Sequence, residues 1–446
     1  MKRLLRLAGP MLVVPLLLTT TLAGRPGSAP PLQITVSDIR TLRRLIARAV
    51  LGEFPRGLAL VLAEGANFSL DGTPLNVTSG AEVTLLSEGR GATLDAHGAS
   101  RVVEVSRGGR LTLRRVHLVR GWTTGGGGCA LVRFDVDDNT ANAIATSPSA
   151  AGTNGASETR LVLHECRLER CASDGVGGGV LVQHGTLSAI DSSLEACSAA
   201  IGGGGLAVLE GGRGAFEGGG VRGCTVVGTA GVGVLGGGVF VSGGNLSLSG
   251  TTIANSSAIS NSEGYGGAGG GGMYVSDGTL SVTNVIMANN SAIATRGGAT
   301  ADGGGMYVNS GSSVRISGTT IANSSAIANG TAAEKIGVAI GGGLSVIGGT
   351  VTLDNSTISA CEERAPTQRR CIGLSRRPLP EGQQQPYADE RGLESHCHPA
   401  AAAPSRKAKG VTRTAAACMC MAAPSASPTR PLLMATPLLL TTLVAL

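Results

Sequence analysis

The sequence predicts an all-β protein in which short strands stack coil upon coil into a rod. Six segments share one pattern, a run of glycines followed by apolar–any–apolar, at spacings of 26, 33, 34, 33 and 38 residues. They begin at Gly177, Gly203, Gly236, Gly270, Gly303 and Gly341. Such a recurring unit cannot bury an apolar face alone but can do so when stacked on its neighbours. Of 446 residues, 71 are Gly and few are aromatic (Phe 5, Tyr 4, Trp 1), so the core must be aliphatic and narrow.

The N-terminal residues 1–24 have the order of a secretory signal peptide. They begin with basic residues, continue with an uncharged run from Met11 to Leu18, and end near the small pair Ala23-Gly24. We therefore expect a secreted or cell-surface protein.

Residues 37–50 predict an amphipathic helix that caps one end of the array. Ser37 is a suitable N-cap, and the apolar positions share one helical face. They are Ile39, Leu42, Leu45, Ile46, Ala49 and Val50. An open-ended solenoid core needs such a lid.

Residues 51–361 predict the stack itself, about ten coils with three strands each, or a rod of roughly 50 Å at 4.8 Å per coil. The glycine run leads into a first strand, an alternating strand such as 279–283 follows, and a third segment comes last. That third segment, Thr251–Ile259, recurs almost verbatim as Thr319–Ile327. Gly/Ala-rich segments of variable length (260–269, 294–302 and 328–340) are expected to leave one corner as loops.

These repeats resemble the right-handed parallel β-helix of pectin-lyase-like proteins. Their closest local similarity is to the Gly-Gly-(Ala)-Ile and Phe-x-x-Asn repeats of chlamydial polymorphic outer-membrane proteins. Here the first motif is Gly-Gly-Gly-Met/Val, and the second becomes Met287-Ala-Asn-Asn290 or a variant ending in Ser or Cys. The resemblance covers residues 51–361 and implies a surface β-helix. It does not extend to the C-terminal barrel of those bacterial proteins.

The same resemblance raises the alternative of a polysaccharide lyase or glycoside hydrolase. Hydrolases of this fold need paired Asp residues, a His-Gly and an Arg-Ile-Lys triplet on neighbouring coils. Asp137-Asp138 and His184-Gly185 are present, but Arg315-Ile316 is followed by Ser317 and lies several coils from His184. Lyases need an acidic Ca²⁺ cluster and a basic residue, and residues 236–361 hold few of either. We assign no catalytic residue.

A binding role is the favoured prediction, as an adhesin-like or extracellular structural module for a polysaccharide or a surface protein. The middle position of each glycine-run strand is expected to face solvent, which would stack Phe240, Tyr274 and Tyr307 on consecutive coils as a platform for a ligand. The alternative is a ring ladder that only stiffens the rod.

The net charge of +6 does not indicate a nucleic-acid partner. Residues 1–50 carry eight Lys/Arg and one acid, and residues 362–446 carry eleven and six, whereas residues 51–361 hold 17 Lys/Arg and 23 acids. Phosphate binding needs clustered cations on the folded surface, and the body is mildly acidic.

Ten cysteines are present, and adjacent coils would bring Cys171 and Cys197 within disulfide distance, about 4.8 Å. Buried reduced thiols are the alternative. The clusters His396-Cys397-His398 and Cys418-Met-Cys420 lack a partner group of suitable spacing, so we predict neither a metal site nor a cofactor.

Eight Asn-x-Ser/Thr sequons fit an exported glycoprotein. They are at Asn67, Asn76, Asn245, Asn255, Asn289, Asn323, Asn329 and Asn355. Three of them recur coil after coil, where glycans about 5 Å apart would collide, so we expect incomplete occupancy there.

The C-terminal residues 362–430 contain arginine pairs, an alanine run and scattered prolines without a strand pattern. Disorder is the prediction, and a misassembled reading frame is the alternative. The hydrophobic segment 431–446 is uncharged but short for a membrane span. Small residues upstream make it compatible with a lipid-anchor signal.

Overall fold

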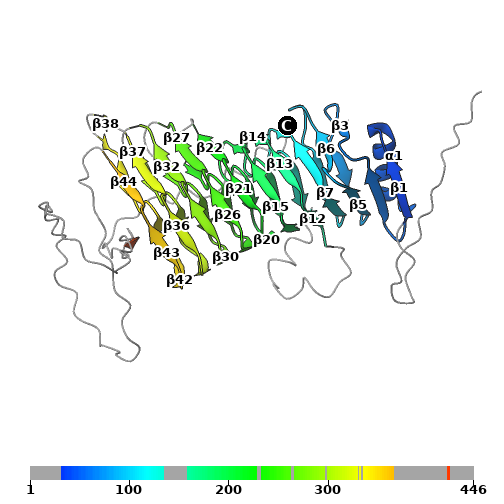
Figure 1. Ribbon diagram of the computed structural model, residues 1–446. Helices are drawn as coiled ribbons and strands as arrows, with labels where there is room; N and C mark the ends of the chain where they lie inside the picture. Colours follow the sequence, from blue (N-terminus) through cyan, green and yellow to red (C-terminus); the bar gives the residue numbers. More distant parts are fainter. Residues whose placement is uncertain are drawn as a thin grey trace, which may run out of the picture.

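The chain folds as a parallel β-helix whose coils stack side by side along one rod, with a single helix at its first end (Figure 1). The computed structural model describes residues 32–134, 158–228, 233–262, 266–296, 299–329, 331–332, 335–365 and 419–421. Its strands form five parallel sheets, in which each strand pairs with the equivalent strand one coil further on. This confirms the predicted fold class.

The longest sheet, called sheet A, has eleven strands, close to the predicted number of coils. They are β1 (Leu32–Val36), β2 (Leu58–Leu62), β5 (Glu82–Ser87), β8 (Arg110–Arg114), β12 (Arg160–His164), β16 (Thr186–Ile190), β20 (Arg213–Glu217), β25 (Asn245–Ser249), β30 (Thr279–Thr283), β35 (Ser313–Ser317) and β42 (Thr350–Asp354).

Sheet B follows sheet A in each coil. Its strands are β3 (Asn67–Ser69), β6 (Ala92–Asp95), β9 (Val116–Val119), β13 (Arg167–Glu169), β17 (Ser193–Glu195), β21 (Gly220–Arg222), β26 (Thr252–Ala254), β31 (Ile286–Ala288), β36 (Thr320–Ala322) and β43 (Thr357–Ser359).

Sheet C contains the strands that follow the glycine runs. They are β4 (Leu75–Val77), β7 (Val103–Ser106), β11 (Ala130–Arg133), β15 (Val180–Gln183), β19 (Leu206–Val208), β24 (Val239–Ser242), β29 (Met273–Ser276), β34 (Met306–Val308), β41 (Leu344–Val346) and β45 (Met419–Met421).

Sheets D and E connect sheet B to the next strand of sheet C. Sheet D has β10 (Trp122–Thr123), β14 (Ala172–Ser173), β18 (Ser198–Ala199), β22 (Thr225–Gly228), β27 (Ser257–Ser260), β32 (Ser291–Ala294), β37 (Ser325–Ala328) and β44 (Glu362–Arg364). Sheet E has β23 (Val234–Leu235), β28 (Ala268–Gly269), β33 (Thr300–Asp302) and β40 (Val338–Ile340), and a small hairpin pairs β38 (Thr331–Ala332) with β39 (Lys335–Ile336).

The prediction of three strands per repeat was wrong, because a left-handed residue divides the third segment. Asn255 has φ 55°, and the equivalent Asn289 and Asn323 have φ 56° and 50°. Asparagine tolerates this conformation better than most residues, so the backbone bends there and starts a separate sheet D strand. The segments predicted as corner loops also contain strands, since three of the four strands of sheet E (β28, β33 and β40) lie within them.

The predicted capping helix is present, but along the chain it lies between the first two strands of sheet A and not ahead of the whole stack. Helix α1 (Ile39–Val50) follows β1, which pairs with β2, so the stack begins at Leu32 and not at residue 51. Its N-cap is Asp38, which accepts a hydrogen bond from the Thr41 amide (2.9 Å), in place of the predicted Ser37. The helix buries its apolar face over the open end of the core.

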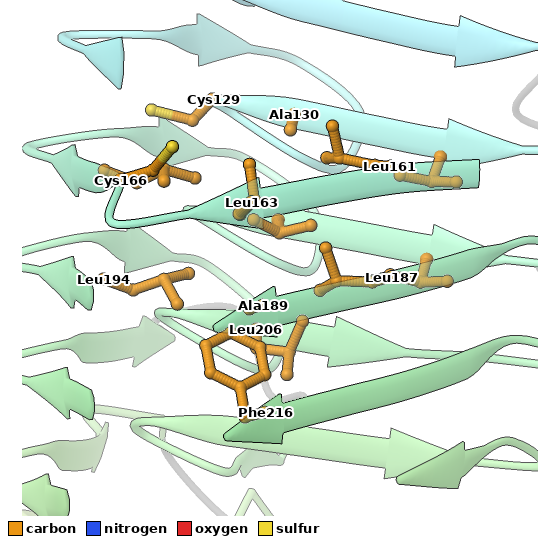
Figure 2. Close-up of a cluster of buried hydrophobic side chains, with 14 of the residues drawn as sticks. Cys129, Ala130, Leu161, Leu163, Cys166, Leu187, Ala189, Leu194, Leu206 and Phe216 are labelled. Atoms are coloured by element: carbon orange, nitrogen blue, oxygen red, sulfur yellow. The ribbon is translucent and has the colours of Figure 1, made fainter. Parts of the chain in front are cut away.

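The core inside the coils is aliphatic, with one ring in its middle coils (Figure 2). Phe216 is buried, and it pairs across the sheet with the small Ala189. At Gly214, two residues earlier, a Cβ would lie 2.7 Å from a methyl group of Leu246, so a side chain there would displace that leucine. Small residues beside the ring therefore keep the coil width constant.

Two described strands fall within residues 362–430, which the sequence predicts to be disordered. They are β44, at the end of sheet D, and β45, whose backbone pairs in parallel with β41. The predicted signal peptide and the hydrophobic segment 431–446 lie outside the described residues. In the part of the chain that the structure covers, no helix has the length and apolar character of a membrane span.

Candidate functional site

The predicted aromatic platform is a buried ladder. The rings of Phe240 and Tyr274 lie 5.6 Å apart between centroids, and those of Tyr274 and Tyr307 lie 5.1 Å apart. Phe240 is only 8% exposed and Tyr274 6%, while Tyr307 is half-buried. The expectation that these rings face solvent was therefore wrong.

The reason is the chain that leads into each glycine run. It passes over the outer face of sheet C, so that a Cβ at Gly202 would lie 2.9 Å from the Phe240 ring. A Cβ at Gly269 would lie 3.2 Å from both tyrosine rings. The alternation of side chains along the strand correctly predicts that the rings point outward from sheet C. The chain segment that leads into each glycine run covers them.

Asp302 of β33 is a partly buried acidic group close to Tyr307 of this ladder. Burial raises the pKa of its carboxyl to about 6, and its Oδ1 has no hydrogen-bond partner within the described part of the chain. Burial, with a smaller contribution from Asp302, also raises the pKa of Tyr307 to about 12. The hydroxyl of Tyr274 accepts a hydrogen bond from the Asn309 side chain (2.9 Å).

A hollow of about 560 Å³ opens instead on the early coils, between sheets B and D. It is lined by His97, Gly98, Arg120, Gly121, Trp122, Arg170 and Ala172. Trp122, the single tryptophan of the chain, is 39% exposed. It pairs with Ala172 on the next coil, whose small side chain leaves the indole uncovered.

Two arginines stand beside Trp122 because of the same corner that divides the repeats. Arg120 and Arg170 have φ 53° each and occupy the left-handed position on consecutive coils. The Arg120 amide donates to the carbonyl of Glu169 (3.0 Å), which fixes one coil against the other. Arg170 pairs with Glu169 (3.2 Å) and is largely exposed.

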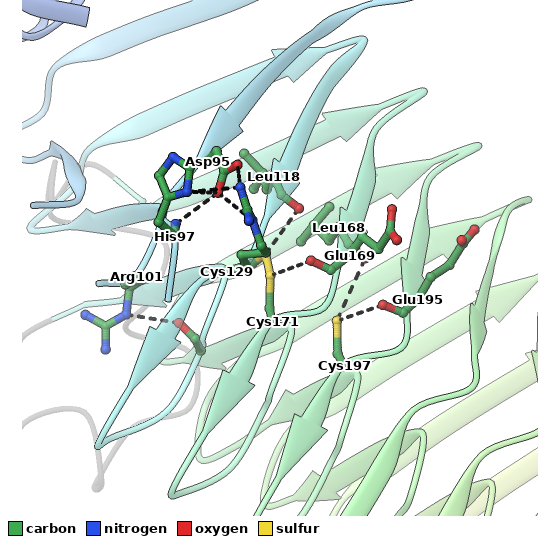
Figure 3. Close-up of a disulfide and its surroundings, with 12 residues drawn as sticks. Asp95, His97, Arg101, Leu118, Cys129, Leu168, Glu169, Cys171, Glu195 and Cys197 are labelled. Atoms are coloured by element: carbon green, nitrogen blue, oxygen red, sulfur yellow. Dashed lines mark hydrogen bonds and ion pairs between the residues drawn. A yellow bond between two sulfur atoms is a disulfide. The ribbon is translucent and has the colours of Figure 1, made fainter. Parts of the chain in front are cut away.

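The Arg120 side chain is held by a buried carboxylate on the preceding coil (Figure 3). Its Nε donates to Asp95 Oδ1 (3.0 Å), its Nη2 pairs with Oδ2, and the same Nη2 lies 3.0 Å from His97 Nδ1. Burial is the largest influence on the pKa of Asp95 and raises it, but the hydrogen bonds from Arg120 and the His97 amide, with the charge of Arg120, together outweigh burial and lower that pKa. The polar wall of the hollow is therefore fixed before any ligand arrives.

Further acids and bases line the coils beyond the hollow, and they pair with one another. Glu165 lies 2.5 Å from Arg115, and Arg167 bridges Glu169 (3.2 Å) and Glu195 (2.7 Å). No three His, Cys, Asp or Glu side chains of the described ranges come together as a potential metal site.

The hollow was not predicted from the sequence. Its residues come from three coils, and the available signal was the lone Trp122 directly after the glycine that follows Arg120. Asp137 and Asp138, which the hydrolase comparison singled out, lie outside the described residues, as do His396, Cys397 and His398.

The disulfide joins Cys171 to Cys129, not to Cys197 (Figure 3). The Cα atoms of Cys129 and Cys171 are 5.4 Å apart, and Cys197 is a buried thiol. Register pairs Ala130 with Val180, so Cys129 occupies the position of Gly179 one coil on. That position faces the cysteine column, since a Cβ at Gly179 would lie 3.4 Å from Cys197 Sγ. A cysteine in place of this glycine brings a thiol to Cys171.

All eight sequon asparagines are exposed, which leaves their side chains accessible. Asn255, Asn289 and Asn323 also supply the left-handed corner conformation, so their recurrence has a backbone cause independent of glycosylation.

No protein-family model and no curated protein matches this sequence. Among solved structures, the chain is similar to ORF18 of Geobacillus virus E2, at 11% identity and a TM-score of 0.21. The match covers 69% of this chain and 53% of the viral one, so this chain spans about half the length of that protein. A likeness of this size carries no argument about function.

Proposed function

We propose that this protein is an extracellular, adhesin-like β-helix that binds carbohydrate in the Trp122 hollow. The observation that carries the proposal is an exposed indole beside a polar wall that is already fixed by its own hydrogen bonds. The C–H face of a sugar ring is apolar and stacks on an indole, while its hydroxyls need donors and acceptors at the rim.

The rim supplies both kinds of group. Arg120 and Arg170 line the hollow and can donate hydrogen bonds to sugar hydroxyls, and the Glu169 carboxylate, which pairs with Arg170 next to the hollow, can accept them. A sugar that carries a carboxylate or a sulfate would gain an ion pair with Arg170, whose side chain is 71% exposed. The signal-peptide pattern and the exposed sequons support an extracellular location.

A second candidate is a polysaccharide lyase or hydrolase, because acids and bases do gather on the coils around the hollow. Against it, Asp95, Glu165, Glu169 and Glu195 each form an ion pair with an arginine. The hydrogen bond from Arg115 lowers the pKa of Glu165, and the pKa of Asp95 is lowered in spite of its burial, so these two carboxylates are weak general acids or bases near neutral pH.

The test is a glycan array probed with the full chain, beside a cleavage assay on the bound polysaccharides. We expect Trp122→Ala to weaken binding at least about tenfold, equivalent to about 1.4 kcal/mol. Ile201→Ala is the matched control, since Ile201 is equally exposed (40%) and lies outside the hollow. Equal binding by Trp122→Ala and the unsubstituted protein would refute the site. Release of new sugar chain ends in the cleavage assay would instead support the polysaccharide lyase or hydrolase.

A further inference from the structure

Three cysteines occupy one inward-facing column on consecutive coils. Cys171, Cys197 and Cys224 each follow the corner residue between sheets B and D, and all three are buried. The Ser198 amide donates to the carbonyl of Cys171 (2.8 Å), and the Thr225 amide donates to that of Cys197 (2.9 Å). Each cysteine is therefore one strand spacing, about 4.8 Å, from the next.

That spacing lies within the range of Cα separations that a disulfide bridges. The neighbouring Cys197 thiol is the largest cause, ahead of burial, of the raised pKa of Cys224, in agreement with this spacing. Their thiols point the same way, each toward a leucine carbonyl of the preceding coil, at 3.8 Å and 3.7 Å.

The position of Cys129 determines which cysteines of this column can form disulfides with each other. It takes Cys171 in the first disulfide, so Cys197 cannot bond to Cys171. Of the three column cysteines and Cys129, which faces the column at Cys171, only the pairs Cys129–Cys171 and Cys197–Cys224 use every thiol. Cys166 belongs to the other corner, where its neighbour on the next coil is Ser192.

We propose that Cys197 and Cys224 form a second disulfide in the mature protein. Each thiol loses a proton, and the pair gives two electrons to a disulfide oxidant such as oxidised glutathione, which leaves as two thiols. One disulfide would then join the coil of Cys129 to that of Cys171, and the other would join the coil of Cys197 to that of Cys224. The inference rests on the extracellular location proposed above, because such bonds persist in oxidising compartments. It does not depend on carbohydrate binding.

The experiment is peptide mapping by mass spectrometry of the full chain isolated from a culture that produces it (the cellular protein, taken from cells and medium together), after free thiols are alkylated in denaturant without reduction. A glutamate-specific protease cuts after Glu195 and so separates Cys171 from Cys197, which trypsin alone leaves in one peptide. We expect the peptides of Cys197 and Cys224 to be joined, and Cys166 to be alkylated. Alkylation of both Cys197 and Cys224 beside an intact Cys129–Cys171 bond overturns the proposal.

Two further arms keep the outcome clear. In Cys224→Ser, Cys197 should become fully alkylated while the first disulfide remains, whereas Cys166→Ser should leave both bonds intact. The full chain is also refolded in a glutathione redox buffer. A Cys197–Cys224 bond formed there but absent from the cellular protein would support the pairing and refute the extracellular location. Its absence in both samples refutes the pairing.

Discussion

Replacing Phe240 with alanine tests whether the aromatic ladder is buried structure or a ligand platform. The backbone accepts alanine at this position, because Ala207 occupies the same column one coil earlier. The cost of Phe240→Ala is therefore the lost ring contacts and the cavity left behind. Burial of an aromatic ring is worth about 3–5 kcal/mol on truncation. We expect the lower end, about 3 kcal/mol, since this cluster lies outside the main core.

Urea unfolding followed by circular dichroism measures this loss as a shift in the transition midpoint. Ile286→Ala is the control, because Ile286 is 53% exposed on sheet B and should change the unfolding free energy by less than about 0.5 kcal/mol. If Phe240→Ala is as mild as the control, the ring is not packed as described. If Phe240→Ala loses glycan binding without losing stability, the ladder is a ligand platform after all.

Three further predictions concern stability. Gly271→Ala should lower the unfolding free energy by more than about 2 kcal/mol, because its Cβ would lie 2.2 Å from the backbone of the sheet D strand β32. Gly233→Ala is the control and should be near neutral, because the nearest atom to its Cβ would be 3.5 Å away. Thermal melts compare the two variants. Asp302→Asn should raise the unfolding free energy at pH 7.5 by about 3 kcal/mol but not at pH 4. The folded pKa of about 6 exceeds the unfolded value of 3.8, so the native state binds more protons and loses stability as pH rises between them; urea titrations at both pH values test this. Cys129→Ser together with Cys171→Ser should cost about 4 kcal/mol, from the 42-residue separation. Reduction of the Cys224→Ser variant, in which Cys129–Cys171 is the one remaining bond of the two, should lower its midpoint in urea by a similar amount.

The repeats predicted the stack well because alternation and glycine position are local properties. Val275 and Val308, expected on one inward column, pair in register and are both buried. The left-handed corner at Asn255 was not predicted, because the Asn-Ser-Ser triplet there matches a glycosylation sequon and is equally compatible with a bend. The site was less predictable. The cover over Phe240 comes from the connection between sheets, and the wall beside Trp122 comes from Asp95, one coil earlier.

The central claim, that each repeat advances the chain by one strand spacing, is tested most directly by distances between spin labels along sheet A. Thr84, Ser188, Ser281 and Thr352 share one outward column. From Thr84, the others lie three, six and eight strands away, or about 14, 29 and 38 Å at 4.8 Å per strand. Electron–electron double resonance with labels on unnatural amino acids should return these distances in linear order. Distances that do not increase with strand number would contradict the stack.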